Sequence, residues 1–492
     1  MLRISPSWSA SGTPFKHSWE GLVNIDQFRW LVRKDCLEHL KMAHDELGAR
    51  HVRAVGMYCD ELRVFGPDPS WFGKPGPHTM QPNWQVVDYI IDELNAIGIQ
   101  PMFTTTFMPS HMAAGDMTVF TTKSRTSMPK DLKVWEDFVS TSVRHQIDRL
   151  GLENVRNWYF EVWNEPNLSP PFFEGTQADF FKLWQATWNG IKRVDESLRV
   201  GGPSAARAEW IADFVDWAAA NRCPADYVIT HVYNNDSANC ALSPFDGPQT
   251  DKANTSLHFS SGVVRGTRKI LDDRNFRGEV HWNEWGRSWF PCDHLRESAQ
   301  EAAWTAKTMG EVSQLADKFA YWNLSDVYDQ VGYGATPFHD NYGMLNLQGL
   351  RKPMYQGFRL LSRLGDRQVP VTGAGLDANL NAIATTNGRG YQVYVYAVSE
   401  TPEQHRSVAV SVQLPRGGTP TLTRIGHEEN NILASWRAMG APANLTRQQR
   451  DDLRSANALT SSNAIVMERR GDEWWATFTM DCPGTALMEL AF

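Results

Sequence analysis

Eight β-rich runs alternate with helical patterns over the first two-thirds of the chain. In residues 83–98, apolar side chains recur at helical spacing and Gly98 follows them, which is typical of a helix that ends before the next strand. The segments 34–48 and 131–151 end on glycine in the same way. This repeated alternation predicts a (β/α)8 TIM barrel over residues 16–350. A doubly wound sheet is the competing arrangement, but no glycine-rich phosphate turn follows the first run. The eight expected strands are residues 20–25, 51–58, 100–107, 157–165, 198–204, 227–233, 278–285 and 318–326.

A different pattern begins after about residue 350. Four runs of β-branched and aromatic residues lack helical spacing and are separated by turn residues. They predict a C-terminal antiparallel β-sandwich domain over residues 351–492. A short helical insert near 429–457 interrupts it, and residues 1–15 are a candidate additional strand. The four runs are residues 391–398, 407–414, 473–480 and 485–492.

Composition and charge exclude several classes of protein. Lys and Arg number 48 against 56 Asp and Glu, a net charge of −8, which argues against nucleic-acid binding. No run approaches the roughly 18 apolar residues of a membrane span. The first residues lack the apolar core of a signal peptide, so a cytoplasmic protein is expected. The six cysteines form no Cys-x-x-Cys pair, which argues against a zinc ribbon or a disulfide framework.

Polar and aromatic side chains gather where the predicted strands end. Glu165 ends the fourth expected strand, and Glu284 lies one residue before the end of the seventh. His231 and Tyr233 end the sixth strand on one face, because side chains alternate with period two. Trp322 belongs to the eighth. Barrel enzymes place their active sites at these carboxyl ends, so we expect the five side chains to meet at one rim.

Two glutamates at one rim are the pair that glycoside hydrolysis needs. One protonates the leaving oxygen, and the other attacks the anomeric carbon or activates water. Carboxyl groups about 5–5.5 Å apart predict retention of configuration, and about 6.5–9.5 Å predicts inversion. A Tyr233 hydroxyl that donates to Glu284 would hold that carboxylate ionised. No metal and no cofactor are expected, because His231 has no second histidine at ligand spacing and no calcium-type loop occurs. The absence of a Gly-x-Ser-x-Gly motif argues against an esterase.

Several segments resemble glycoside hydrolase family 39, in the branch that holds the bacterial β-xylosidases. The stretch Trp158–Leu168, with Asn164-Glu165-Pro166 at its centre, is similar to the family's acid/base strand. The Asn-Glu-Pro core alone indicates only a clan of retaining (β/α)8 barrels. The likeness covers nearly the whole chain, and its further segments are residues 115–120, 198–203, 230–233, 321–328, 423–425 and 430–431.

The resemblance implies a role for each matching residue. Glu165 corresponds to the general acid/base and Glu284 to the nucleophile, and proximity of the Glu284 anion is expected to raise the pKa of Glu165. The implied substrate-binding residues are Asn164 at the sugar 2-hydroxyl, His231 and Tyr233 lining the sugar site, Trp322 as its aromatic wall, and Asp329 at a position where the family usually has a glutamate. The implied activity is that of an exo-acting xylan 1,4-β-xylosidase, a retaining enzyme that releases xylose from the non-reducing end of small xylo-oligosaccharides.

The chain also departs from the family pattern around the sugar. Val55 stands where the family often has histidine, Thr121 and Thr122 replace aromatic residues, and Gln330 replaces a second glutamate. Asn283 precedes Glu284 where threonine is more usual. Because the catalytic pair is intact, the reaction type is a firmer expectation than xylose. The same mechanism on an α-L-iduronide or a β-glucoside stays open, as do an endo-acting xylanase and an inactive sugar-binding protein. Oligomeric state is also left open.

Overall fold

The computed structural model describes residues 1–66, 81–237, 256–328, 330 and 332–492. Its first domain is an eight-stranded parallel sheet in the order β14-β13-β12-β11-β10-β7-β4-β3. The two ends of that order meet, because the Leu324 N–H donates to the Asn24 carbonyl at 3.0 Å and closes the barrel. The strands are β3 (Leu22–Gln27), β4 (His51–Val55), β7 (Gln100–Thr104), β10 (Tyr159–Glu161), β11 (Arg199–Ala205), β12 (Tyr227–Tyr233), β13 (Glu279–Gly286) and β14 (Lys318–Tyr321). The (β/α)8 prediction is therefore confirmed, and each strand overlaps its predicted run.

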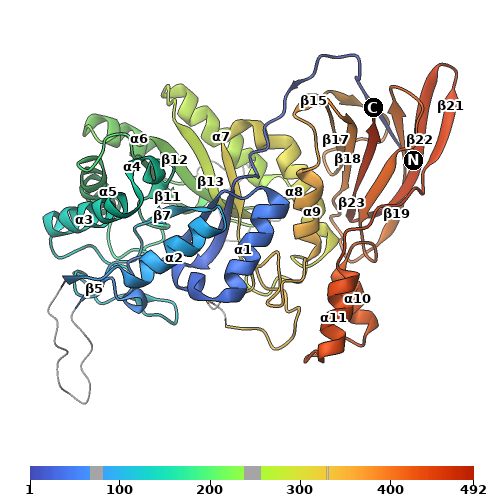
Figure 1. Cartoon of the computed structure of the whole chain (residues 1–492). Helices are drawn as coiled ribbons and strands as arrows, with labels where there is room; N and C mark the ends of the chain where they lie inside the picture. Colours follow the sequence, from blue (N-terminus) through green and yellow to red (C-terminus); the bar gives the residue numbers. More distant parts are fainter. Residues whose placement is uncertain (67–80, 238–255, 329, 331) are drawn as a thin grey trace.

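One main helix follows each strand and packs outside the barrel (Figure 1), and the short additional helix α4 (Leu152–Val155) precedes β10. The sequence sets their ends: the Thr176 side chain and Asp179 form a capping box at the start of α5, and Gly48 in the left-handed region ends α1. The helices are α1 (Lys34–Leu47), α2 (Gln85–Ala96), α3 (Leu132–Leu150), α5 (Gln177–Lys192), α6 (Ile211–Ala220), α7 (Phe259–Asp273), α8 (Ala299–Val312) and α9 (Pro353–Leu361). The eighth helix thus lies just beyond residue 350. The domain boundary placed there stays a prediction.

The second domain is a sandwich of two sheets (Figure 1). One sheet has the order β16-β1-β19-β22-β21 and the other β2-β15-β17-β18-β23-β20. All pairs are antiparallel except β1 with β19, which run parallel. The strands are β1 (Leu2–Pro6), β2 (Thr13–Pro14), β15 (Arg367–Val369), β16 (Val371–Thr372), β17 (Leu380–Asn387), β18 (Gly390–Ala397), β19 (Arg406–Leu414), β20 (Thr421–Ile425), β21 (Val466–Arg470), β22 (Glu473–Cys482) and β23 (Gly484–Ala491). Both termini consequently lie in this domain.

The two domains share apolar packing and hydrogen bonds. Tyr394 and Tyr396 of β18 belong to the same buried cluster as the barrel core. Gln300 of α8 donates to the Ser399 carbonyl at 2.7 Å and accepts the Ser399 N–H at 3.0 Å. The helices α10 (Ile432–Ala438) and α11 (Arg447–Ala456) extend from one end of the sandwich (Figure 1). The sandwich therefore packs against the outside of the barrel at α8.

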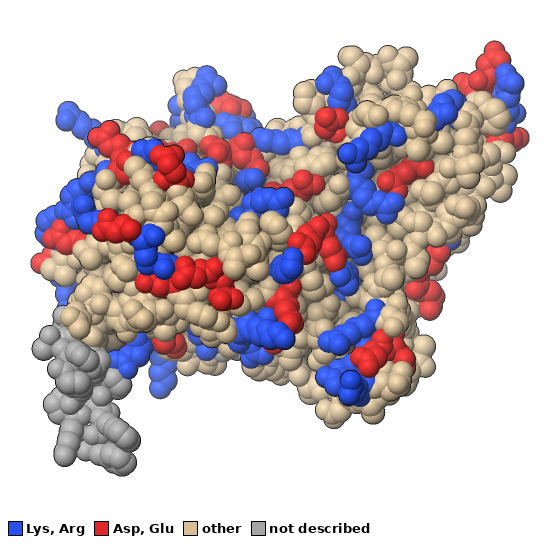
Figure 2. Space-filling model, in the orientation of Figure 1, with Lys and Arg blue, Asp and Glu red and all other residues tan. Residues whose placement is uncertain are grey.

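Charge on the visible surface is mixed. Figure 2 shows Lys and Arg interspersed with Asp and Glu over the face drawn there. Among the described residues, no helix has the length and apolar character needed to cross a bilayer.

Candidate active site

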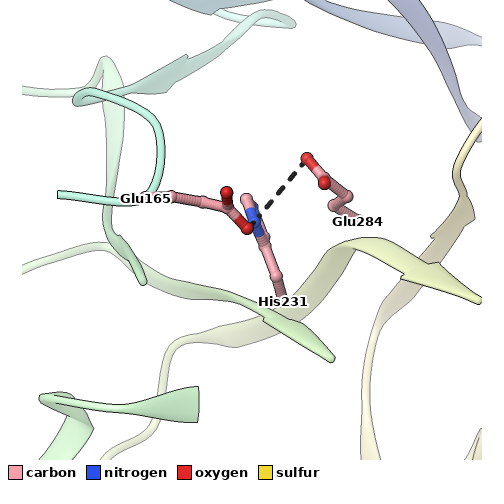
Figure 3. Close-up of side chains that lie close together, drawn as sticks. All are labelled: Glu165, His231 and Glu284. Atoms are coloured by element: carbon pink, nitrogen blue, oxygen red, sulfur yellow. Dashed lines mark hydrogen bonds and ion pairs between the residues drawn. The ribbon is translucent and has the colours of Figure 1, made fainter. Parts of the chain in front are cut away.

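Side chains from three barrel strands converge at their carboxyl ends. Glu165 follows β10, and His231 and Glu284 lie on the neighbouring strands β12 and β13; Figure 3 shows these three pointing toward one another. A register shift between Thr230 and His231 pairs His231 with Glu284 instead of Asn283. Such a bulge re-aims a side chain, which is why bulges are common beside active sites.

The two glutamates are close and almost fully buried. Glu165 is 7% exposed and Glu284 is 8% exposed. Their nearest carboxylate oxygens lie within 4.8 Å of each other, with His231 Nδ1 in the same group of atoms. His231 Nδ1 is 2.9 Å from Glu165 Oε1 and 3.6 Å from Glu284 Oε2. This spacing is closer to the about 5–5.5 Å of retaining carboxyl pairs than to the about 6.5–9.5 Å of inverting pairs.

Glu284 is held by a hydrogen-bond donor on each oxygen. The Tyr233 hydroxyl donates to Oε1 at 2.8 Å, as expected from the sequence, and Arg53 Nη1 donates to Oε2 at 2.8 Å. Burial, with the Glu165 charge adding to it, raises the pKa of Glu284 overall, and the Arg53 charge and the Tyr233 hydroxyl oppose that rise. Both donors aim and stabilise the ionised carboxylate that a nucleophile needs.

Glu165 has a different environment. Its side chain is hydrogen-bonded to His231, and burial raises its pKa to about 7, with the Glu161 carboxylate adding to the rise and the Arg53 and Arg207 charges opposing it. Burial is thus the largest cause, rather than the Glu284 anion. Burial also lowers the pKa of His231 to about 4, so its imidazole is neutral at pH 7. A neutral ring with its proton on Nδ1 donates to Glu165 Oε1 and leaves Oε2 to carry the glutamate's own proton.

The raised pKa of Glu165 predicts a stability that depends on pH. The unfolded carboxyl titrates near 4.5 and the folded one near 7, so folding opposes ionisation by about 3 kcal/mol above pH 7. Both states are protonated below about pH 4, where this penalty vanishes. We therefore expect Glu165→Gln to raise the free energy of unfolding by up to about 3 kcal/mol at pH 8 and by nearly nothing at pH 4. Chemical denaturation at the two pH values tests this, with the exposed Glu153→Gln as control; an equal effect at both would contradict the assigned environment.

Arg53 was not singled out from the sequence and lies at the centre of the site. Its Nε and Nη2 donate to the two Glu161 oxygens at 2.8 and 3.0 Å, and Nη2 also donates to Asn164 Oδ1 at 2.5 Å. Arg53 and Glu161 are both fully buried. Because Asn164 accepts from Arg53 through its oxygen, its Nδ2 group is left to donate to a ligand. A signal was available: opposite charges within two buried parallel strands require partners.

Removing Arg53 should destabilise the whole site. Arg53→Met leaves Glu161 and Glu284 without their shared cation, and breaking a buried pair costs about 3–5 kcal/mol. We expect the free energy of unfolding to fall by this amount in urea denaturation. Arg274→Met is the matched control, because Arg274 forms an exposed pair with Asp216 at 2.9 Å and its loss should cost less than about 1 kcal/mol. Equal effects of the two changes would show that Arg53 is not the structural centre.

A pocket of about 400 Å³ opens over the glutamate pair, within the range of small-ligand sites. Trp322 lines it and belongs to a buried aromatic cluster with Tyr233, Tyr328 and Tyr342. Asn164, His231 and Val55 also line the pocket. Gln330 lines it too, donates to Asp26 Oδ1 at 2.7 Å and accepts from the Tyr328 hydroxyl. Asp329, the remaining candidate, lies outside the described residues.

The side chains of Glu165, His231 and Glu284 are close enough together to hold a metal ion. Within the described part of the chain, Glu165, His231 and Glu284 form the one such cluster. The Arg53 guanidinium already provides a positive charge 2.8 Å from Glu284 and opposes a second cation there. The donor set therefore fits a pair of acids around a sugar better than a cation site.

Comparison with known proteins agrees with this geometry. The sequence model for Glycosyl hydrolases family 39 matches residues 3–473. The chain belongs to glycoside hydrolase family 39. The resemblance noted in the sequence is confirmed, and the protein is a glycoside hydrolase.

Several known proteins are similar to the chain over nearly its full length. A β-xylosidase of Caldicellulosiruptor saccharolyticus is 30% identical over 90% of this chain and 88% of its own length. A β-xylosidase of Geobacillus stearothermophilus is 28% identical over 90% and 86%. Among solved structures, a monomeric β-xylosidase from Caulobacter crescentus CB15 has a TM-score of 0.84 at 28% identity, covering 100% of this chain and 99% of that one. The GH39 enzyme from Xanthomonas axonopodis pv. citri has a TM-score of 0.82 at 30% identity, with 99% and 97% covered.

Proposed function

We propose that this family 39 glycoside hydrolase is a retaining, exo-acting β-xylosidase that releases xylose from the non-reducing end of xylo-oligosaccharides. The observation that carries the proposal is the short separation of two carboxyl groups in contrasting surroundings. Arg53 and Tyr233 hold the carboxylate of Glu284, whereas the pKa of Glu165 is about 7. The names of the full-length relatives support xylose as the sugar.

In the first step, Glu284 attacks the anomeric carbon and forms a glycosyl ester. Its two donors hold the carboxylate in place while the sugar binds. Glu165 gives its proton to the departing oxygen as the glycosidic bond breaks. A group with a pKa of about 7 is well suited to this task, because a large fraction is protonated near neutral pH.

In the second step, Glu165 acts as the base. Once Glu284 is esterified, one negative charge has left the site, and ionised Glu165 is no longer opposed by it. Glu165 then removes a proton from water, the water oxygen bonds to the anomeric carbon, and Glu284 leaves as carboxylate. Two displacements restore the original configuration. His231 Nδ1 lies between both carboxyl groups and keeps Glu165 oriented through each step.

The sugar is the part of the proposal that a substrate panel tests most directly. Initial rates would be compared on aryl β-xyloside, β-glucoside, β-galactoside, α-L-arabinoside and α-L-iduronide. We expect β-xyloside to be fastest, and we expect xylopentaose to give xylose and xylotetraose at early times. Faster hydrolysis of the iduronide or the glucoside would overturn the assignment of xylose as the sugar. It would point to Val55 and Gln330, which line the pocket where the family pattern is altered. Early release of xylobiose or xylotriose would overturn the exo mode.

A further inference from the structure

We propose that Arg207 and Asp236 form a subsite for the second, leaving sugar, and that this subsite selects an uncharged hydroxyl-bearing ring. The inference rests on the proposed roles of Glu165 and Glu284. Neither residue belongs to the segments on which the family resemblance depends.

Strand order divides the pocket into two halves. Val55 is the last residue of β4. Trp322, Gln330 and Tyr342 come from the segment after β14, and β3 lies between β4 and β14 in the barrel. The other half is lined by the segments after β10, β11 and β12. Glu165 stands in this second half. A group that protonates the leaving oxygen must lie on the side from which the leaving sugar departs, so the second half is the place for that sugar.

A hydrogen-bonded loop holds Arg207 at the pocket wall. Asn167 Oδ1 accepts the Ala206 N–H at 2.8 Å, and its Nδ2 donates to the Ala206 carbonyl at 3.0 Å and to Glu209 Oε2 at 2.9 Å. Arg207 itself has φ of +58°, in the left-handed region, a conformation that persists where its surroundings enforce it. Its guanidinium pairs with Glu209 at 2.9 Å and its side chain keeps 27% exposure, toward a pocket that it lines.

Asp236 lines the same half from the turn after β12. It is 6% exposed, its Oδ2 accepts the Tyr233 N–H at 2.8 Å, and its own N–H donates to the Tyr233 carbonyl at 3.0 Å. Burial, with the Glu165 charge adding to it, raises the pKa of Asp236 to about 8. The carboxyl is therefore mostly protonated at pH 7 and can donate as well as accept a hydrogen bond.

The chemistry of this half fits a neutral sugar. Leu168, Pro171 and Phe172 supply apolar surface for the C–H face of a ring, and Arg207 and Asp236 supply polar atoms for its hydroxyl edge. Glu209 balances the Arg207 charge, and protonated Asp236 carries none. A net-neutral subsite favours a hydroxyl-bearing ring over a uronate or a cation.

The test compares a disaccharide with an aryl glycoside of the same sugar. We expect Arg207→Met and Asp236→Ala each to lower kcat/KM for xylobiose about 10-fold or more, mainly through KM, while that for 4-nitrophenyl xyloside changes less than about 2-fold. Asp236→Asn keeps an oxygen that accepts the Tyr233 N–H and keeps polar atoms facing the sugar, so this variant should retain most of the xylobiose rate. Arg274→Met, an exposed ion-paired arginine, should leave both substrates unchanged.

Each alternative result has a distinct meaning. Equal losses on both substrates would overturn the subsite and show that the residues act through Glu165 or Tyr233. Unchanged xylobiose kinetics would overturn it as well. A preference for another sugar in the panel would overturn only the assignment of xylose as the substrate sugar. The ratio of kcat/KM for the disaccharide to that for the aryl glycoside can then be measured with the matching sugar.

Discussion

Glu284→Ala should reduce kcat/KM for 4-nitrophenyl β-xyloside by roughly 10⁴-fold or more, the scale at which removal of a catalytic nucleophile acts. The reason is geometric: Glu284 is the carboxylate that Arg53 and Tyr233 hold from both oxygens at 2.8 Å, beneath the pocket. No other carboxylate of the described residues that line the pocket has these two donors. Initial rates measured on the purified variant, with folding checked by circular dichroism, test the expectation.

Chemical rescue adds a second readout for Glu284→Ala. Azide that enters the space left by the carboxylate attacks from the nucleophile's side and should give an α-xylosyl azide. Glu279→Gln is the matched control, because Glu279 lies on the same strand but at the opposite end of the barrel, bonded to Tyr159 and His281. Its activity should stay within about 2-fold of wild type. A Glu284→Ala variant that hydrolysed the xyloside at more than a hundredth of the normal rate would remove Glu284 from the nucleophile role.

Glu165→Ala should separate substrates by their leaving groups. Xylobiose needs its departing oxygen protonated, and general-acid catalysis contributes about 10²–10⁴-fold, so kcat/KM should fall by that amount. From a 2,4-dinitrophenyl xyloside, the dinitrophenolate departs without needing a proton, so the rate of glycosyl-enzyme formation should change little. The glycosyl-enzyme should then accumulate, and dinitrophenolate should be released in a burst. Stopped-flow measurement of the dinitrophenolate burst and steady-state rates on xylobiose give the two numbers.

The pH profile provides the check on the same variant. Loss of the Glu165 proton should give wild-type kcat/KM an alkaline limb near pH 7, and Glu165→Ala should lack it. The acid limb, set by protonation of Glu284, should remain. Equal slowing of both leaving groups, or an unchanged alkaline limb, would mean that another group is the acid.

The barrel and its strand ends were predictable because they rest on local signals. Each strand is a short apolar run followed by a helix and often a glycine, so Glu165, His231, Tyr233 and Glu284 could be placed at one rim from order alone. The family resemblance then supplied candidate roles. Their separation could not be predicted, because it depends on the bulge that pairs His231 with Glu284.

The parts that were missed depend on contacts between distant segments. Arg53 reaches Glu161 and Glu284 across 108 and 231 residues of sequence, a network that period and spacing do not reveal. Asp236 lies in the turn after β12, where no strand pattern indicates its direction. The parallel pairing of β1 with β19 joins the first strand to one that begins at Arg406, and such pairing is set by tertiary packing.

The first anomer formed is the most direct test of the paired-carboxylate mechanism. Proton NMR would follow hydrolysis of 4-nitrophenyl β-xyloside by the wild-type enzyme before mutarotation mixes the products. Two displacements at carboxyl groups within 4.8 Å predict that β-xylose appears first. Initial appearance of α-xylose would mean a single displacement by water and would contradict the assignment of Glu284 as nucleophile.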